Sequence, residues 1–158
     1  MIKKYLYFIL FALISFQGFS QVTWTFNNNS LNGWTEFRLN VSYNTNNVIF
    51  TTKGQNNPRL DHASTNVNAD LYKFAIIKLR TAAGGPTLLR MNNIDGGNFS
   101  TTPITPGSST FDTYIINMTD PSWAGTVNNL QLAFRTDDGS NGGTTYNSNG
   151  VTIEIEQI

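Results

Sequence analysis

Hydrophobic and polar residues alternate in many short runs along this chain. In residues 22–26, Val22, Trp24 and Phe26 alternate with threonines, and residues 72–81 also place their apolar positions two residues apart. This alternation is typical of β-strands, because successive side chains of a strand point to opposite faces. The pattern predicts strands over residues 22–26, 33–43, 47–52, 72–81, 87–93, 111–118, 130–136 and 151–158.

Turn-forming sequences separate these runs. Stretches such as NTNN, AAGGP and DDGSNGG stand between them, and no window repeats apolar residues at the spacing of an amphipathic helix. Many short strands joined by such turns predict an all-β fold, an antiparallel β-sandwich or barrel. We expect about eight strands and no helix longer than about two turns. Residues 137–150 are expected to form a long loop.

The first residues differ from the rest of the chain. Lys3 and Lys4 precede an apolar stretch over residues 5–16, and small residues follow up to Ser20. This order is that of a secretory signal peptide, whose apolar region is too short to cross a bilayer as a helix. We therefore expect residues 1–20 to be a signal peptide and residues 21–158 to be one domain. The domain is expected to be secreted, periplasmic or on the cell surface.

Composition and charge narrow the classes of function. The chain has no cysteine, so no disulfide and no lipid anchor on cysteine is expected. Without Lys3 and Lys4, eight of the ten basic residues remain against ten acidic ones, a net charge of about −2. Nucleic-acid-binding domains usually carry a clear basic excess, so no nucleic-acid partner is expected. Neutral Asn, Thr, Ser and Gly dominate the polar positions.

The order of short motifs carries a resemblance to a known family. The chain reads WTFNNNSLNGWT, then NNPRLD, NADLYKFAIIKLR and FDTYIINMTDPSWAGTVNNLQLAF, and last GVTIEIEQI. This order resembles the galactose-binding-like β-jelly-roll carbohydrate-binding modules of secreted polysaccharide-degrading proteins from Bacteroidetes-type bacteria. The resemblance implies a jelly-roll β-sandwich that binds a polysaccharide or oligosaccharide without catalysis.

The resemblance also implies a structural calcium ion that joins the two ends of the domain. Asn27 or Asn29 would supply ligands from the first segment, and Glu154 would supply a carboxylate from the last strand. The related modules usually have Asp at the position of Glu154. The alternative is that Glu154 is an exposed residue of an edge strand.

Basic residues recur opposite the apolar faces of three predicted strands. Lys78 and Arg80 lie on the first of these strands, Arg90 on the second and Arg135 on the third. Asn92 falls on the same side as Arg90, and Gln131 on the same side as Arg135. If these strands lie together, the basic groups share one concave surface that suits the carboxylates or sulfates of an anionic polysaccharide. The alternative is a solvated outer face with scattered charges.

The segment NNPRLDHAS, residues 56–64, breaks the alternation with Pro58. Proline disfavours continuation of a strand, so we expect a loop at the rim of the sheet, where Arg59 contacts ligand. We expect the single histidine, His62, to have no such role. Trp24 and Trp34 are expected in the core. Tyr146 lies in a Gly- and Asn-rich stretch and is expected to be an exposed ligand contact.

Catalytic patterns are weak in this sequence. It has one histidine and no Gly-x-Ser-x-Gly motif, which argues against nucleophilic hydrolysis. The main hypothesis is a secreted, non-catalytic carbohydrate-binding module, a monomer without membrane insertion. The alternatives are a structural or adhesive cell-surface β-sandwich without a sugar site and, third, an unrecognised polysaccharide lyase.

Overall fold

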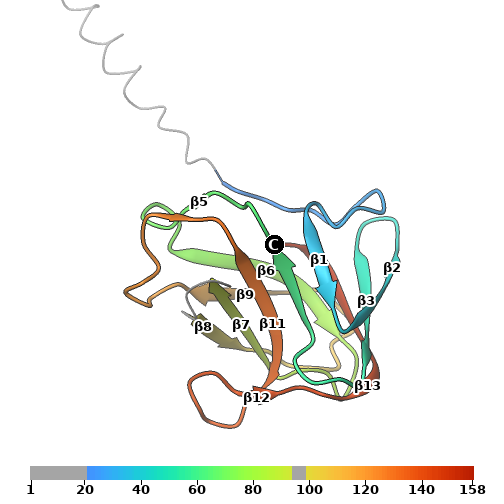
Figure 1. The fold of residues 1–158 in the computed structure, drawn as a ribbon. Helices are drawn as coiled ribbons and strands as arrows, with labels where there is room; N and C mark the ends of the chain where they lie inside the picture. Colours follow the sequence, from blue (N-terminus) through green and yellow to red (C-terminus); the bar gives the residue numbers. More distant parts are fainter. Residues whose placement is uncertain (1–20, 94–98) are drawn as a thin grey trace, which may run out of the picture.

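The computed structural model describes residues 21–93 and 99–158, which form antiparallel β-sheets that face each other (Figure 1). These residues contain no helix, and therefore none that could cross a membrane. The predicted all-β sandwich is confirmed, although the described part of the chain has thirteen strands where about eight were expected. The strands are β1 Trp34–Phe37, β2 Leu39–Tyr43, β3 Val48–Lys53, β4 Arg59–His62, β5 Val67–Asn68, β6 Phe74–Thr81, β7 Leu88–Asn93, β8 Phe99–Pro103, β9 Asp112–Asn117, β10 Thr126–Val127, β11 Leu130–Thr136, β12 Thr144–Thr145 and β13 Asn149–Gln157.

Two large sheets make up the sandwich. The six-stranded sheet has the order β1-β4-β11-β7-β8, with β12 paired to β11. The five-stranded sheet has the order β2-β3-β13-β6-β9, and β5 and β10 form a small third sheet. Only β2 and β3, β7 and β8, and β11 and β12 are consecutive strands that pair in these two sheets, and the other pairs, such as β4 with β11 and β13 with β6, join distant parts of the described chain. Their pairing could not be read from local pattern alone.

The core lies between the two large sheets. Each sheet turns alternate apolar side chains toward the other, as the period of two requires. The side chains of the two inner faces that are at most 1% exposed include Leu60, Leu89, Met91, Leu132 and Phe134 on one sheet and Phe50, Ile77, Leu79, Ile153 and Ile155 on the other. Because the chain has no disulfide, burial of this apolar surface is the main stabilising contribution.

Residues 33–43, predicted as one strand, form two strands in different sheets. Arg38 separates β1 from β2 and has a φ of 62°, a left-handed conformation that interrupts a strand. The break also shifts the alternation, so that Trp34 and Leu39 are both buried although they lie five residues apart. Phe37 is left on the outer face of the six-stranded sheet, as the Cα partner of Arg59.

The segment 56–64 is not a rim loop, and that prediction is wrong. Residues 59–62 form β4, an interior strand between β1 and β11. Pro58 stands immediately before this strand, and its carbonyl accepts a hydrogen bond from the Phe134 amide at 3.1 Å. A proline is tolerated at the start of a strand because no backbone donor is needed there. Arg59 is therefore placed near the middle of the sheet.

The two ends of the described chain lie side by side. The Trp24 amide donates to the Ile158 carbonyl at 2.8 Å, and the Ile158 amide donates back to the Trp24 carbonyl at 2.9 Å. Residues 22–26 form no strand of their own, only an isolated bridge between Thr25 and Gln157. Backbone hydrogen bonds therefore join the first segment to the end of β13.

Candidate functional site

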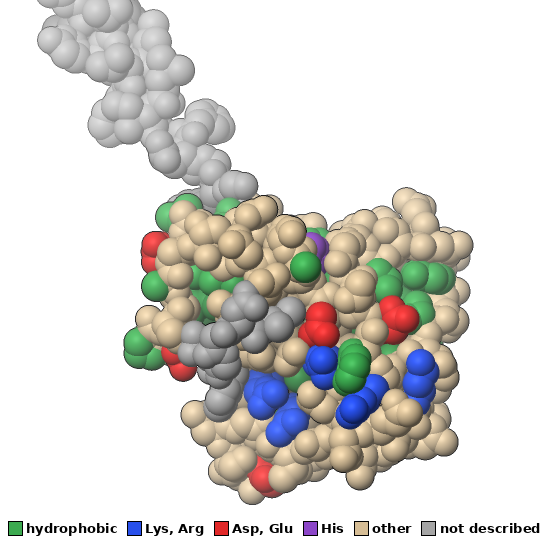
Figure 2. All heavy atoms as spheres, viewed as in Figure 1, with side chains coloured by type: hydrophobic (Ala, Val, Ile, Leu, Met, Phe, Trp, Pro, Cys, Tyr) green, Lys and Arg blue, Asp and Glu red, His purple; other side chains and the backbone are tan. Residues whose placement is uncertain are grey.

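One row of side chains crosses the outer face of the six-stranded sheet. Phe37, Arg59, Ala133, Arg90 and Thr101 are successive Cα partners on β1, β4, β11, β7 and β8. Residues two positions away on each strand share this face. We call the surface the arginine face and define it by Phe37, Arg59, Asp61, Arg90, Asn92, Gln131 and Arg135. Figure 2 shows basic side chains gathered on this side of the molecule, with hydrophobic and acidic side chains beside them.

A polar network fixes one half of the arginine face. The Arg59 Nε donates to both carboxylate oxygens of Asp61, at 3.2 and 3.0 Å. The Gln131 Nε2 donates to Asp61 Oδ1 at 2.8 Å. The carboxylate thus holds a cation and an amide on two neighbouring strands in fixed positions. Such preorganisation lowers the entropy that a ligand loses when it binds these groups.

Phe37 lies under the cationic group of this network. The guanidinium carbon of Arg59 is 3.7 Å from the centroid of the Phe37 ring, and that of Arg38 is 4.6 Å from it. Stacking of a guanidinium on an aromatic ring is a cation–π contact and also shields one surface of the cation. Phe37 was not expected on this face, because continuous alternation over residues 33–43 puts it on the same side of the strand as Leu39, which is buried. The positive φ of Arg38 breaks the strand, so that Phe37 points outward while Leu39 points into the core.

Arg90 and Arg135 form the other half of the arginine face. Burial lowers the pKa of Arg90, and the positive charge of Arg135 lowers it further. Burial also lowers the pKa of Arg135, while the charge of Asp138 raises it. Two neighbouring cations that are partly withdrawn from water favour binding of an anionic group, because the anion stabilises the charged forms of both guanidinium groups.

The loop before β13 holds the guanidinium of Arg135. Its Nη2 donates to the Gly143 carbonyl at 2.6 Å, its Nε to the Gly142 carbonyl at 3.2 Å, and its Nη1 to Thr145 Oγ1 at 3.4 Å. The long loop expected over residues 137–150 is present over residues 137–148, with the short β12 inside it, and β13 begins at Asn149. This loop therefore orients a side chain of the arginine face.

Lys78 and Arg80 do not belong to this surface, so the predicted single stripe of four basic residues is wrong. Both lie on β6 in the five-stranded sheet. There the Lys78 Nζ is 2.8 Å from Glu156 Oε1, and the Arg80 Nη2 is 2.9 Å from Glu154 Oε2. The outer faces of the two sheets of a sandwich point in opposite directions. The six-stranded sheet brings together Arg90, Asn92, Gln131 and Arg135. Lys78 and Arg80 face the opposite way.

Glu154, the predicted calcium ligand, is not an exposed residue of an edge strand. It lies on β13 between β3 and β6, and its Oε2 accepts hydrogen bonds from Asn47 Nδ2 at 2.8 Å and from Arg80. Across residues 21–93 and 99–158, no group of three His, Asp or Glu side chains is positioned to hold a metal. Calcium at Asn27, Asn29 and Glu154 stays a prediction, and at Glu154 Oε2 the ion would compete with Arg80.

Tyr146 is not the exposed contact that was predicted. Its side chain is only 4% exposed, and its hydroxyl donates to the Gly84 carbonyl at 2.7 Å. Burial raises the pKa of the Tyr146 phenol, against the opposing effect of a hydrogen bond with Ser148. Tyr146 thus anchors the loop between β12 and β13 to the turn after β6. Its partner lies 62 residues away in sequence, so local composition gave no sign of this contact.

His62 is a buried packing residue of β4 and not part of an exposed loop. Its ring centroid lies 5.3 Å from that of Trp24 and 5.2 Å from that of Trp34. Its ring nitrogens contact the backbone oxygens of Ala63 at 2.8 Å and Asn32 at 3.2 Å. Trp34 is buried as expected, while Trp24 is only partly buried at the edge of the core.

Comparison with known proteins gives similarity at the level of structure. No protein-family model and no curated protein sequence matches the chain. Three similar solved structures have a TM-score of 0.51: a mutant of a carbohydrate-binding module of family 29, a second such mutant complexed with cellulohexaose, and a further module of family 29. Identities are 13%, 13% and 14%, and the matches cover 85% of this chain and 87%, 87% and 84% of the others. The likeness shows that this chain has the β-sandwich fold of those modules.

Proposed function

We propose that this chain is a secreted, non-catalytic carbohydrate-binding module that binds a polysaccharide on the arginine face. The observation that carries the proposal is the row of Phe37, Arg59 and Arg90 across neighbouring strands of one sheet. A flat surface of several strands can accommodate consecutive units of an extended chain. The structural likeness to carbohydrate-binding modules supports the same function.

The polysaccharide is an anionic one, with carboxylate or sulfate groups. Arg59, Arg90 and Arg135 carry guanidinium groups, which bind carboxylate and sulfate oxygens. Asp61 and the loop before β13 already take some of the donors of Arg59 and Arg135. Asn92 and Gln131 are Cα partners in the next row of the sheet, on the side of Arg59 and Arg90 that is away from Arg135. Their amides are suited to the hydroxyl groups of a sugar. Asp61 orients Arg59 and Gln131 rather than contacting an anion itself.

The absence of a suitable carboxylate pair on the arginine face supports a binding role without catalysis. Glycoside hydrolysis generally needs two carboxyl groups on either side of the scissile bond. The arginine face as defined includes one, Asp61, and its oxygens are held by Arg59 and Gln131. The proposal of export rests on the signal-like order of charged, apolar and small residues over residues 1–20.

Binding to immobilised or dissolved glycans tests the proposal. We expect alginate or a sulfated galactan to bind more tightly than a neutral glucan, and added salt to weaken the binding because exposed charges are screened within about 8 Å at physiological ionic strength. Arg90→Gln should lose about tenfold or more in affinity, the effect of one charged hydrogen bond. Lys53→Gln is the matched control, because Lys53 is exposed at the end of β3 in the other sheet.

The outcomes separate this function from the alternative of an adhesive domain. Equal binding of neutral and anionic glycans, unchanged in Arg90→Gln, would refute the role of the arginine face. Failure to bind any glycan in a broad array would favour a structural or adhesive cell-surface domain with the same fold.

A further inference from the structure

A second candidate site lies at one end of the sandwich, away from the row of arginines. A pocket of about 600 Å³ opens there between the two large sheets. Its walls come from the first described segment, the connection between β5 and β6, the start of β6, β7, the turn before β10, the start of β11 and the last residue. Ligand pockets typically have volumes of about 300–1,000 Å³, so this one has the size of a small-molecule site.

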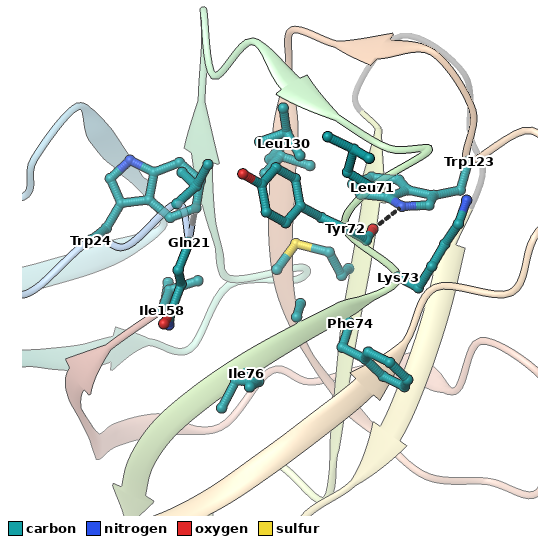
Figure 3. Close-up of a pocket in the computed structure, with 14 residues that line it drawn as sticks. Gln21, Trp24, Leu71, Tyr72, Lys73, Phe74, Ile76, Trp123, Leu130 and Ile158 are labelled. Atoms are coloured by element: carbon teal, nitrogen blue, oxygen red, sulfur yellow. Dashed lines mark hydrogen bonds between the residues drawn. The ribbon is translucent and has the colours of Figure 1, made fainter. Parts of the chain in front are cut away.

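The lining of the pocket is mostly apolar. Trp24, Tyr72 and Trp123 contribute aromatic rings, and Met91 and Leu130 come from the core side of the six-stranded sheet. Figure 3 shows the Tyr72 ring between Trp24 on one side and Trp123 on the other. The Trp123 Nε1 donates to the Tyr72 carbonyl at 2.8 Å, so the polar group of this indole is already used. A sugar would bury several hydroxyl groups here with few partners, which costs free energy.

Exposed apolar side chains continue from the pocket onto the surface. Leu71 and Phe74, which line the pocket, are 72% and 60% exposed, and Ile76 is also exposed. Large exposed apolar side chains that adjoin a pocket are typical of a surface that an apolar ligand covers. The lining therefore suits a flexible hydrocarbon chain that fills the open end of the sandwich and extends along β6.

One cation marks the polar end of such a ligand. Among the described residues that line the pocket, Lys73 alone has a charged side chain, and its Nζ donates to the Ala69 carbonyl at 2.8 Å. An ammonium group has three donors, so two remain for a ligand. Ile158 lines the opposite side of the pocket from Lys73 (Figure 3). The charge at the Lys73 end complements an anion.

We propose that this pocket binds a fatty acid, with its hydrocarbon chain in the open end of the sandwich and along the start of β6 and its carboxylate at Lys73. This site is independent of the arginine face, which lies on the outer surface of one sheet. Binding of a fatty acid and binding of a polysaccharide can therefore be measured and lost separately.

Dodecanoate below its micelle-forming concentration is the first probe. Binding should be saturable at one site and should change the fluorescence of the protein, because Trp24 and Trp123 line the pocket. Shorter fatty acids should bind about fourfold more weakly for each methylene removed, as expected from burial of about one CH₂ group. A response that rises linearly without saturation would overturn the proposal.

Methionine methyl groups report where the probe binds. Met91 lines the pocket, and Met118 is buried outside its lining. In a spectrum of ¹³C-methyl-labelled methionine, dodecanoate should shift the Met91 signal much more than the Met118 signal. Equal shifts of both signals would indicate a general loosening of the core and would contradict a site in this pocket.

Two surface variants test the hydrocarbon part without disturbing the core. Phe74→Ser should weaken dodecanoate binding by about tenfold, since burial of most of a phenyl ring gives a factor of this size. Ile115→Ser is the matched control, because Ile115 is the 54%-exposed Cα partner of Ile76 on β9 and does not line the pocket. Equal weakening by both variants would refute the assignment to the pocket.

A charge variant tests the carboxylate. Lys73→Met should weaken dodecanoate binding by about threefold, the effect of one exposed ion pair, and should leave binding of methyl dodecanoate unchanged. Tighter binding of dodecyltrimethylammonium than of dodecanoate would overturn the proposed polarity. Polysaccharide affinity should be the same in Phe74→Ser and Lys73→Met as in the native chain.

Discussion

Arg59 stacks on Phe37, its cross-strand partner, with the guanidinium carbon 3.7 Å from the ring centroid. The same guanidinium is bound by Asp61, two residues along β4. One contact fixes the plane of the cation and the other fixes its direction along the strand. Arg59 is thus held by packing and by charge together, which favours a ligand that needs a cation at a defined place.

We expect Phe37→Leu to weaken binding of an anionic polysaccharide by about threefold, because an exposed cation–π contact is worth about 0.5–1 kcal/mol. The salt dependence of binding should also become shallower as Arg59 loses its fixed position. Tyr43→Leu is the control, since Tyr43 is an exposed aromatic residue at the end of β2 in the other sheet. Isothermal titration at two salt concentrations measures both effects. Identical behaviour of the two variants would contradict a positioning role for Phe37.

Local alternation in the sequence predicted which side chains of one strand share a face, but not which strands lie in the same sheet. On β7 and β11 the period of two is regular, so Arg90 and Arg135 were correctly placed opposite Met91 and Phe134. The same rule placed Arg80 opposite Leu79, but it could not show that β6 lies in the other sheet. Strand pairing depends on contacts between distant residues, and two sheets that share one core expose opposite faces.

Two other differences between expectation and structure have local causes that the sequence shows only weakly. Arg38 adopts a positive φ, which is uncommon for a residue other than glycine, asparagine or aspartate. Pro58 was taken as the sign of a loop, yet it directly precedes an interior strand. In both cases the tertiary contacts of the flanking strands override the local preference of one residue.

Gly33→Ala should destabilise the fold more than Gly139→Ala. Both glycines have positive φ, 89° and 79°, and the left-handed conformation costs an alanine about 1–2 kcal/mol at either position. At Gly33 a Cβ atom would also lie 2.6 Å from His62 Nε2, whereas at Gly139 nothing lies within 4 Å. We expect this overpacking to add about 1–3 kcal/mol. Urea unfolding of the two variants measures the difference, and equal losses would mean that His62 moves aside without cost.

Tyr146→Phe should lower the stability of the fold at neutral pH. The variant should also lose less stability than the native chain when the pH is raised into the alkaline range. The variant removes the hydrogen bond to Gly84, which contributes about 1 kcal/mol. Because the pKa of Tyr146 is raised in the folded state, its contribution is fully present below the unfolded value of about 10 and is lost as pH rises through the folded value. The native chain should therefore lose stability more steeply above about pH 10 than the variant does. Parallel unfolding curves from pH 8 to pH 11 would contradict this account.

Calcium and Arg80 should compete for the carboxylate of Glu154. If calcium binds at Asn27, Asn29 and Glu154, removal of the Arg80 guanidinium should strengthen calcium binding, because the guanidinium then no longer competes with calcium for Glu154 Oε2. We therefore expect added calcium to raise the melting temperature more in Arg80→Gln than in the native chain, and to have no effect in Glu154→Gln. A site saturated at 100 times its dissociation constant contributes about 2.7 kcal/mol.

Lys78→Gln is the matched control for this competition. It removes the neighbouring ion pair with Glu156 and leaves the groups around Glu154 in place. Its response to calcium and to chelator should equal that of the native chain. A calcium-dependent rise of the melting temperature that persists in Glu154→Gln would place the ion elsewhere. If Arg80→Gln and Lys78→Gln respond alike, Arg80 is not a competitor, and Glu154 serves the ion pair within the five-stranded sheet alone.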